Sequence, residues 1–315
     1  MATYKAIKGY KVQSRASDPT VNEGQIWYNT ASNTLKYDAI GAGSWSAGGD
    51  MNDLRAGGGT GFGTQSAGVA AGGGDPSANN QKVEEYNGTA WTEVGDLPTA
   101  GQQGGTTGSE TAGLAVGIFG DTKSMSYNGT GWTELAAFNT YRAAGCGLGT
   151  LTAALYVGGS PGTPNVELYN GSVWTAVGTL NDGRRQASTG GTTTAGMICG
   201  GAEGSPPTVP TQTETYNGTS WTEVGNLNTG RGYLTGGGAS DDAITCGGGP
   251  PTTNKAEKWN GTSWTEVAAM TTASETSFGT MPGAGSLTYR AKTPSNTATE
   301  EWDNSPAVVK TVTVS

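Results

Sequence analysis

The stretch Tyr86-Asn-Gly-Thr-Ala-Trp91 decides the fold, because close copies of it recur along the chain. An Asn-Gly pair between two β-forming runs is a strong short-range signal for a β-hairpin, since both turn positions need positive φ. The runs that end at each first aromatic residue and begin at each tryptophan are therefore predicted to be paired antiparallel strands. The five clear copies contain Tyr86 and Trp91, Tyr127 and Trp132, Tyr169 and Trp174, Tyr216 and Trp221, and Trp259 and Trp264.

Two looser copies extend the series, one from Tyr37 to Trp45 and one at Trp302-Asp-Asn-Ser, which lacks the second tryptophan. Upstream of each clear hairpin lies an apolar run closed by glycines, such as Leu155-Tyr-Val-Gly-Gly159, and before it a run of tiny residues. Each repeat is thus predicted to have four strands, the innermost made of tiny residues because backbones crowd around an axis there. Four-stranded units that repeat every 40–50 residues are typical of β-propeller blades.

The number of blades depends on residues 1–50. We predict seven blades, with residues 1–50 as an atypical first blade whose strands lie near 3–12, 25–29, 34–38 and 43–48, and residues 51–315 as the others. The alternative is a six-bladed ring in which the strand of Trp45 completes the last blade. Such a strand from the opposite terminus would close the ring and remove its free edges.

Composition excludes several classes of function. The 315 residues include 17 Lys and Arg and carry a formal net charge of -9, so we expect no nucleic-acid binding. Because the chain has no histidine, His-based acid–base catalysis and His-ligated zinc or copper are excluded. The cysteines Cys146, Cys199 and Cys246 are too few and too widely spaced for a disulfide scaffold or a thiolate metal site. We predict no catalytic residue, no cofactor and no metal.

No stretch approaches the roughly 18 apolar residues of a membrane span, so we expect no membrane insertion. The N-terminus also lacks the apolar segment of a signal peptide, so we expect no secretory leader.

The repeated aromatic residues are interpreted as packing between blades rather than as a sugar-stacking surface, because periodic apolar positions are packing positions. The Asn-Gly-Thr/Ser triplets match the N-glycosylation pattern, but turn chemistry explains each of them.

Four arginines fall at one equivalent position of the repeat, and Gly101 and Ser274 interrupt the series. A cluster of guanidinium groups near the channel mouth is a candidate ligand ring, able to bind carboxylates or sulfates in a bidentate manner. The alternative is pairing with the glutamates that follow each tryptophan. The arginines are Arg55, Arg142, Arg184 and Arg231, and the glutamates are Glu93, Glu134, Glu223 and Glu266.

Over residues 51–303 the chain resembles the kelch-repeat β-propellers. The likeness rests on the Gly-Gly after the second strand, the aromatic residue about ten positions later and the tryptophan five beyond, as at Gly159, Tyr169 and Trp174. It weakens in the second blade, where Gly117-Ile118 replaces the doublet. The family implies blades packed face to face around a channel, but it does not imply one function.

The two ends of the chain resemble a different group. Gly24-Gln-Ile-Trp-Tyr-Asn-Thr30 with Thr34-Leu-Lys36, and the ending Val309-Lys-Thr-Val-Thr-Val-Ser315, are similar to tail-fibre-like virion proteins of marine bacteriophages. In these proteins the first two stretches form a β-hairpin near the attachment end.

The resemblance implies a non-enzymatic virion structural protein, made in the host cytoplasm and displayed on the particle, in its tail, where it binds a host-surface glycan or protein. Its expected partners are other virion proteins and further copies of itself. The alternative is a purely architectural capsid decoration or tail-assembly component. A polysaccharide-degrading enzyme would need paired carboxylates that face one cleft, and the sequence shows no such pair.

Overall fold

The computed structural model describes residues 13–17, 26–39, 43–53, 55, 60–73, 81–118, 121–204, 208–274, 279–280, 286–290, 297–303 and 308–311. Every regular element in these ranges is a β-strand, which confirms the prediction of an all-β protein. None of the described residues belongs to a helix of the length and apolarity that crossing a membrane requires.

The strands form seven four-stranded sheets. The chain divides into two compact units, the terminal unit (Met1–Ser44 with Asn304–Ser315) and the propeller-like unit (Trp45–Asp303). This division differs from the one predicted at residue 50, because the last residues of the chain join the first ones.

Five sheets of the propeller-like unit each consist of four strands that are consecutive in the chain. The first contains β5 (Thr60–Thr64), β6 (Ala67–Ala71), β7 (Val83–Tyr86) and β8 (Trp91–Glu93). The second contains β9 (Gly105–Ser109), β10 (Ala112–Val116), β11 (Ser124–Tyr127) and β12 (Trp132–Glu134). The third contains β13 (Cys146–Thr150), β14 (Ala153–Val157), β15 (Val166–Tyr169) and β16 (Trp174–Ala176). The fourth contains β17 (Ser188–Thr192), β18 (Ala195–Cys199), β19 (Thr213–Tyr216) and β20 (Trp221–Glu223), and the fifth β21 (Thr235–Gly238), β22 (Ala243–Cys246), β23 (Ala256–Trp259) and β24 (Trp264–Val267).

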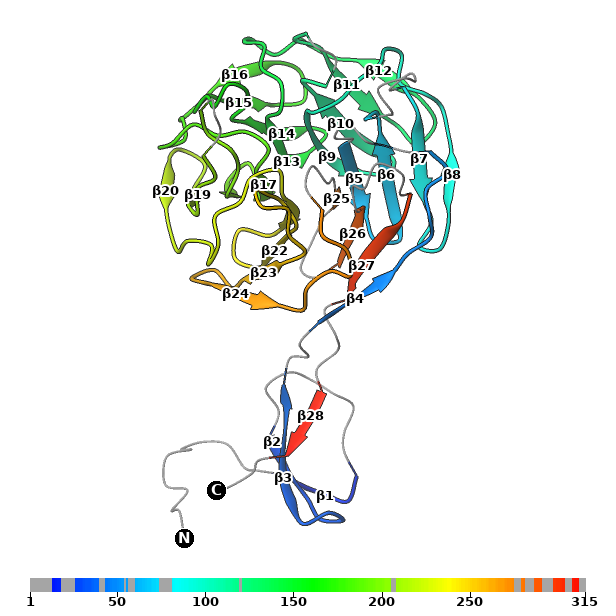
Figure 1. Ribbon diagram of the computed structural model, residues 1–315, viewed down its shortest axis with the longest axis vertical. Helices are drawn as coiled ribbons and strands as arrows, with labels where there is room; N and C mark the ends of the chain where they lie inside the picture. Colours follow the sequence, from blue (N-terminus) through cyan, green and yellow to red (C-terminus); the bar gives the residue numbers. More distant parts are fainter. Residues whose placement is uncertain are drawn as a thin grey trace. The chain divides into compact units, whose positions relative to one another are not determined.

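These sheets are arranged around a common centre, with β5, β9, β13 and β17 nearest to it (Figure 1). At several glycines the inner strands approach so closely that a side chain would not fit. A Cβ atom on Gly147 would lie 2.7 Å from the Thr106 carbonyl oxygen, and one on Gly190 would lie 2.6 Å from the Gly238 carbonyl oxygen. The tiny residues predicted for the innermost strands are therefore required by backbone crowding.

Each repeated hairpin pairs its two aromatic residues directly across the strands, as Tyr86 with Trp91. The prediction that both turn positions have positive φ is wrong, because only the glycine does, for example Gly88 at +88°. The asparagine stabilises the turn with its side chain instead. In the first copy Asn87 Oδ1 accepts hydrogen bonds from the backbone N–H groups of Thr89 and Ala90, at 3.0 and 2.9 Å.

The sixth sheet of this unit has the order β25 (Gly279–Thr280), β26 (Ser286–Arg290), β27 (Thr299–Asp303) and β4 (Ser44–Ala47). Strand β4 thus takes the outer position that the tryptophan-bearing strand has in the other sheets. The ring centroids of Trp45 and Trp302 are 5.3 Å apart. The grouping of residues 43–48 with 25–29 and 34–38 in one N-terminal blade is therefore wrong, and residues 3–12 lie outside the described residues.

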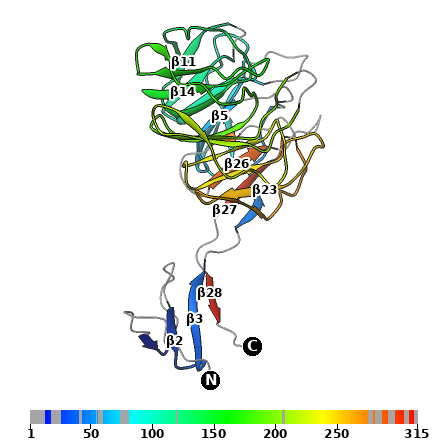
Figure 2. The ribbon, with the colours of Figure 1, turned by 90° about the vertical axis from the view of Figure 1, so that its left-hand side faces the viewer.

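The terminal unit contains the seventh sheet, with β1 (Gln13–Arg15), β2 (Ile26–Asn29), β3 (Thr34–Ala39) and β28 (Val308–Thr311) in that order (Figure 2). Strands β2 and β3 form the hairpin that the Gly24–Thr30 and Thr34–Lys36 stretches predict. Strand β28 pairs antiparallel with β3, so both ends of the chain contribute to one small sheet.

The apolar core lies between successive sheets rather than within one. One cluster joins Phe62, Val69 and Val83 of the first sheet to Ala115 and Tyr127 of the second. Another joins Leu155 and Val166 of the third sheet to Ile198 and Trp221 of the fourth. Sheets packed face to face in this manner make the unit propeller-like.

Candidate functional site

The repeated aromatic residues lie in these interfaces. Within each hairpin the two ring centroids are 4.9 to 5.3 Å apart and the planes are tilted. All ten are buried except Trp132, which is half-buried. The structure thus supports their interpretation as packing residues and not as a sugar-stacking surface.

The four arginines are also buried, with 0 to 3% of their surface exposed. Each forms an ion pair with a glutamate of a third strand in a sheet: Arg55 with Glu84 at 3.1 Å, Arg142 with Glu167 at 2.6 Å, Arg184 with Glu214 at 2.8 Å and Arg231 with Glu257 at 2.9 Å. The proposal of a ligand ring at these arginines is wrong, because their guanidinium groups are enclosed and already bound.

The alternative partners suggested by the sequence are wrong as well. Glu93, Glu134, Glu223 and Glu266 are exposed on the outer strands. Two of them instead pair with lysines of the same sheet, Glu93 with Lys82 and Glu266 with Lys255.

The interface before the third sheet shows how the buried ion pair is held. Arg142 donates from Nε to the Gly158 carbonyl at 2.7 Å and from Nη2 to the Tyr156 carbonyl at 2.9 Å, in addition to its bond from Nη1 to Glu167. Asn139 donates to the other Glu167 oxygen from its backbone N–H at 2.7 Å and from Nδ2 at 2.6 Å. Burial alone would raise the pKa of Glu167, but these hydrogen bonds and the Arg142 charge hold the pKa of Glu167 below its usual range.

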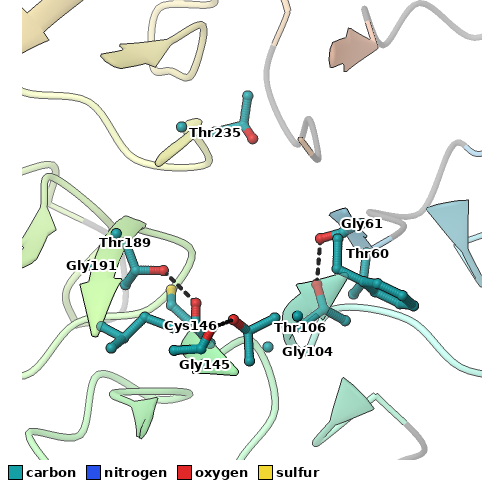
Figure 3. Close-up of a pocket in the computed structure, with 18 of the residues that line it drawn as sticks. Thr60, Gly61, Gly104, Thr106, Gly145, Cys146, Thr189, Gly191 and Thr235 are labelled. Carbon is teal, nitrogen blue, oxygen red and sulfur yellow. Dashed lines mark hydrogen bonds between the residues drawn. The ribbon is translucent and has the colours of Figure 1, made fainter. Parts of the chain in front are cut away.

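With the arginines assigned to packing, the remaining candidate site is a cavity of about 680 Å³ at the centre of the propeller-like unit (Figure 3). It is lined by the inner strands β5, β9, β13, β17 and β21 and by the residues that precede them. Glycine and threonine are the commonest lining residues, and none of the described residues that line it carries a charge.

Threonine hydroxyls tie the inner strands together along this cavity. Thr106 Oγ1 donates to the Gly61 carbonyl at 2.7 Å, and Thr189 Oγ1 donates to the Gly147 carbonyl at 2.8 Å (Figure 3). Each hydroxyl keeps its lone pairs as acceptors. The wall therefore offers neutral hydrogen-bonding groups rather than acids and bases.

A feature that sequence reasoning missed lies at the start of the inner strands. Gln103, Ala144, Gln186 and Tyr233 all have left-handed backbone conformations, with φ of 54°, 58°, 49° and 57°. Such a conformation costs a residue with a Cβ roughly 1–2 kcal/mol relative to right-handed backbone. All four residues line the cavity. Their only sequence signal is position, two residues after the arginine of the repeat or after Gly101.

Thiol and metal chemistry find no support in the described part of the chain. Cys146, Cys199 and Cys246 are free and buried, and burial raises the pKa of Cys146 to about 11 and that of Cys199 to about 12. In the same residues no three His, Cys, Asp or Glu side chains lie together in a group that could hold a metal ion.

Comparison of the sequence with models of protein families finds no match, and comparison with curated proteins finds no similar one either.

Proposed function

We propose that this chain is a non-enzymatic bacteriophage virion protein whose propeller-like unit binds a ligand on the host surface. The observation that carries the binding role is the central cavity, which has a size typical of small-ligand sites and is lined by neutral hydrogen-bonding groups on closely packed strands. The virion assignment rests on the resemblance of the two chain ends to tail-fibre-like proteins.

The finer architecture that we propose is a ring of six blades closed by β4. Its support is a set of contacts between the first sheet and the sheet that contains β4. Gln65 Nε2 donates to Glu301 Oε2 at 2.9 Å, Tyr86 donates from its hydroxyl to Glu301 Oε1, and the Gly49 N–H donates to the Tyr86 hydroxyl at 3.2 Å. Asn52 and Arg55, which follow β4, reach Glu84 of the first sheet just as Asn139 and Arg142 reach Glu167 of the third.

In this proposal the terminal unit attaches the protein to other virion proteins. The support is its topology: β3 and β28 flank the whole propeller-like unit in sequence and pair with each other, so one small sheet contains both connections to the ring. The same observation would serve the second candidate function, a purely architectural component with virion proteins as its sole partners.

The test is immunoelectron microscopy of intact particles with an antibody against this chain, together with adsorption of the purified full-length protein to host cells. Label at the tail and saturable adsorption are the results we expect. Label over the head without adsorption would favour the architectural role. Particles that carry no label would overturn the virion assignment.

A further inference from the structure

The four left-handed residues form a chain of backbone hydrogen bonds around the cavity. The N–H of Ala144 donates to the Gln103 carbonyl at 2.6 Å, that of Gln186 to the Ala144 carbonyl at 2.9 Å, and that of Tyr233 to the Gln186 carbonyl at 2.9 Å. One such residue precedes the inner strand of each of four successive sheets. The backbone is therefore repeated while the side chains differ.

The same inner strands provide an internal comparison. Toward their other end each of these four strands has a second residue with positive φ, and there the residue is always glycine: Gly108, Gly149, Gly191 and Gly238. A Cβ atom on Gly149, for example, would lie 2.3 Å from the Ala153 carbonyl oxygen. At the first position glycine would also suit the backbone best, yet glutamine, alanine and tyrosine occur. Strained residues of this kind are concentrated at binding sites, where the side chain is needed despite its backbone cost.

Their side chains are free to contact a ligand. Gln103 is exposed, Gln186 and Tyr233 are half-buried, and among the described residues none of the three side chains has a hydrogen-bond partner. Amide groups donate and accept at once, which suits adjacent hydroxyls, and a tyrosine adds an aromatic face and a hydroxyl. A charged ligand would meet no counter-charge among the described lining residues and would lose its hydration there without compensation.

We propose that Gln103, Gln186 and Tyr233 form the recognition ring of the cavity and that its ligand is an uncharged saccharide. This inference rests on the proposed function, because it specifies the ligand class and the contact residues of the same site. Hydroxyls of the sugar pair with the two amides, and one sugar face packs on the tyrosine ring.

The test compares glycine variants of the full-length protein: Gln103→Gly, Gln186→Gly and Tyr233→Gly singly and together. Glycine removes the side chain and also relieves the backbone, so the midpoint of thermal unfolding should stay the same or rise. Binding to arrayed neutral oligosaccharides should fall at least tenfold in the triple variant. Ala144→Gly is the matched control, because it changes the same backbone position without removing a recognition side chain, and it should bind as the parent does.

The possible outcomes separate this inference from the proposed function. Unchanged saccharide binding by the triple variant, or a lowered unfolding midpoint in each glycine variant, would show that these side chains have a structural role and would overturn the inference. Binding only to sialylated or sulfated oligosaccharides would overturn the ligand class. If the parent protein adsorbs to host cells but binds no oligosaccharide, the saccharide ligand is overturned and the host-binding function stands. If the parent protein shows neither adsorption nor oligosaccharide binding, the host-binding function is overturned too.

Discussion

Two interfaces of the same propeller-like unit are built in opposite ways. Between the second and third sheets, Asn139 and Arg142 bind the buried Glu167. Between the first and second sheets the corresponding residues are Pro98, Gly101 and Met125, so at this position the interface is apolar.

A fourth position changes along with these three. A Cβ atom on Gly159 would lie 2.9 Å from Cγ of Arg142, so the second glycine of the doublet makes room for the arginine. Where the arginine is missing, Ile118 replaces that glycine, and its side chain would lie 3.1 Å from a Cβ atom on Gly101. In this interface the arginine, the asparagine and the glutamate are all absent, which fits the cost of leaving half of an ion pair buried. Before the sixth sheet, by contrast, the buried Glu300 remains although Ser274 replaces the arginine, and Glu300 accepts hydrogen bonds from the backbone N–H groups of Thr271 and Thr272.

The largest effect that we expect comes from breaking the polar interface at one residue. Arg142→Ala leaves Glu167 buried without its cation and should lower the free energy of unfolding by about 3–5 kcal/mol. Urea denaturation followed by tryptophan fluorescence measures this loss.

The double variant Arg142→Leu with Glu167→Met imitates the apolar interface and is the matched control. It should recover more than half of the stability lost by Arg142→Leu alone. If the double variant is as unstable as the sum of its single substitutions, the two interfaces are not interchangeable solutions and the comparison fails.

A second prediction concerns the interface at which the ring closes. Trp45 is half-buried, contacts Trp302 and donates from Nε1 to the Ala268 carbonyl at 2.9 Å. Trp45→Ala should lower the free energy of unfolding by about 2 kcal/mol, less than for a fully buried tryptophan. Tyr28→Ala, in the terminal unit, is the control and should have little effect on the main unfolding transition. If Trp45→Ala and Tyr28→Ala lower the free energy of unfolding by the same small amount, closure of the ring by β4 is contradicted.

The polar interface should also make stability depend on pH. The pKa of Glu167 is lowered in the folded protein, so its carboxylate stabilises the fold above its unfolded pKa of about 4.3, and this contribution is lost as the pH falls from there through the folded pKa. We expect this acid-dependent loss of unfolding free energy to be smaller than the loss caused by Arg142→Ala. Unfolding measured between pH 3 and pH 7 should show a shallower acid slope for Glu167→Gln than for the parent protein, and parallel slopes would contradict this role.

The difference between the two interfaces also explains what could be predicted from the sequence. Hairpins and inner strands follow from local signals, such as the asparagine and glycine of each turn and the tiny residues where backbones crowd. The burial of Arg142 could not be predicted in this way, because its partner Glu167 lies in the next sheet, 25 residues later in the chain. The pairing of β4 with a strand at the other end of the unit was one of two alternatives, because local signals do not say which sheet a terminal strand joins. The left-handed residues escaped notice because their side chains differ from repeat to repeat.

The smallest effect that we expect concerns the tryptophans of the outer strands, because some of their indole N–H groups are hydrogen-bonded and others are buried without a partner. Trp174 Nε1 donates to Ser124 Oγ at 3.3 Å, and Trp264 Nε1 donates to Thr213 Oγ1 at 2.9 Å. The corresponding residue for Trp221 is Val166, and the Trp221 Nε1 atom is buried without a hydrogen-bond partner. Val166→Thr should supply the missing acceptor and raise the free energy of unfolding by about 1 kcal/mol.

The matched control is Val116→Thr, which buries a hydroxyl in strand β10 beside Trp174, whose indole N–H already has acceptors. It should be destabilising by about 1–2 kcal/mol, because the hydroxyl is then desolvated without its new partner. Thermal unfolding of the two variants beside the parent protein measures the difference. If both variants lose the same stability, the free indole N–H of Trp221 has no energetic consequence, and the residue at position 166 does not control its hydrogen bonding.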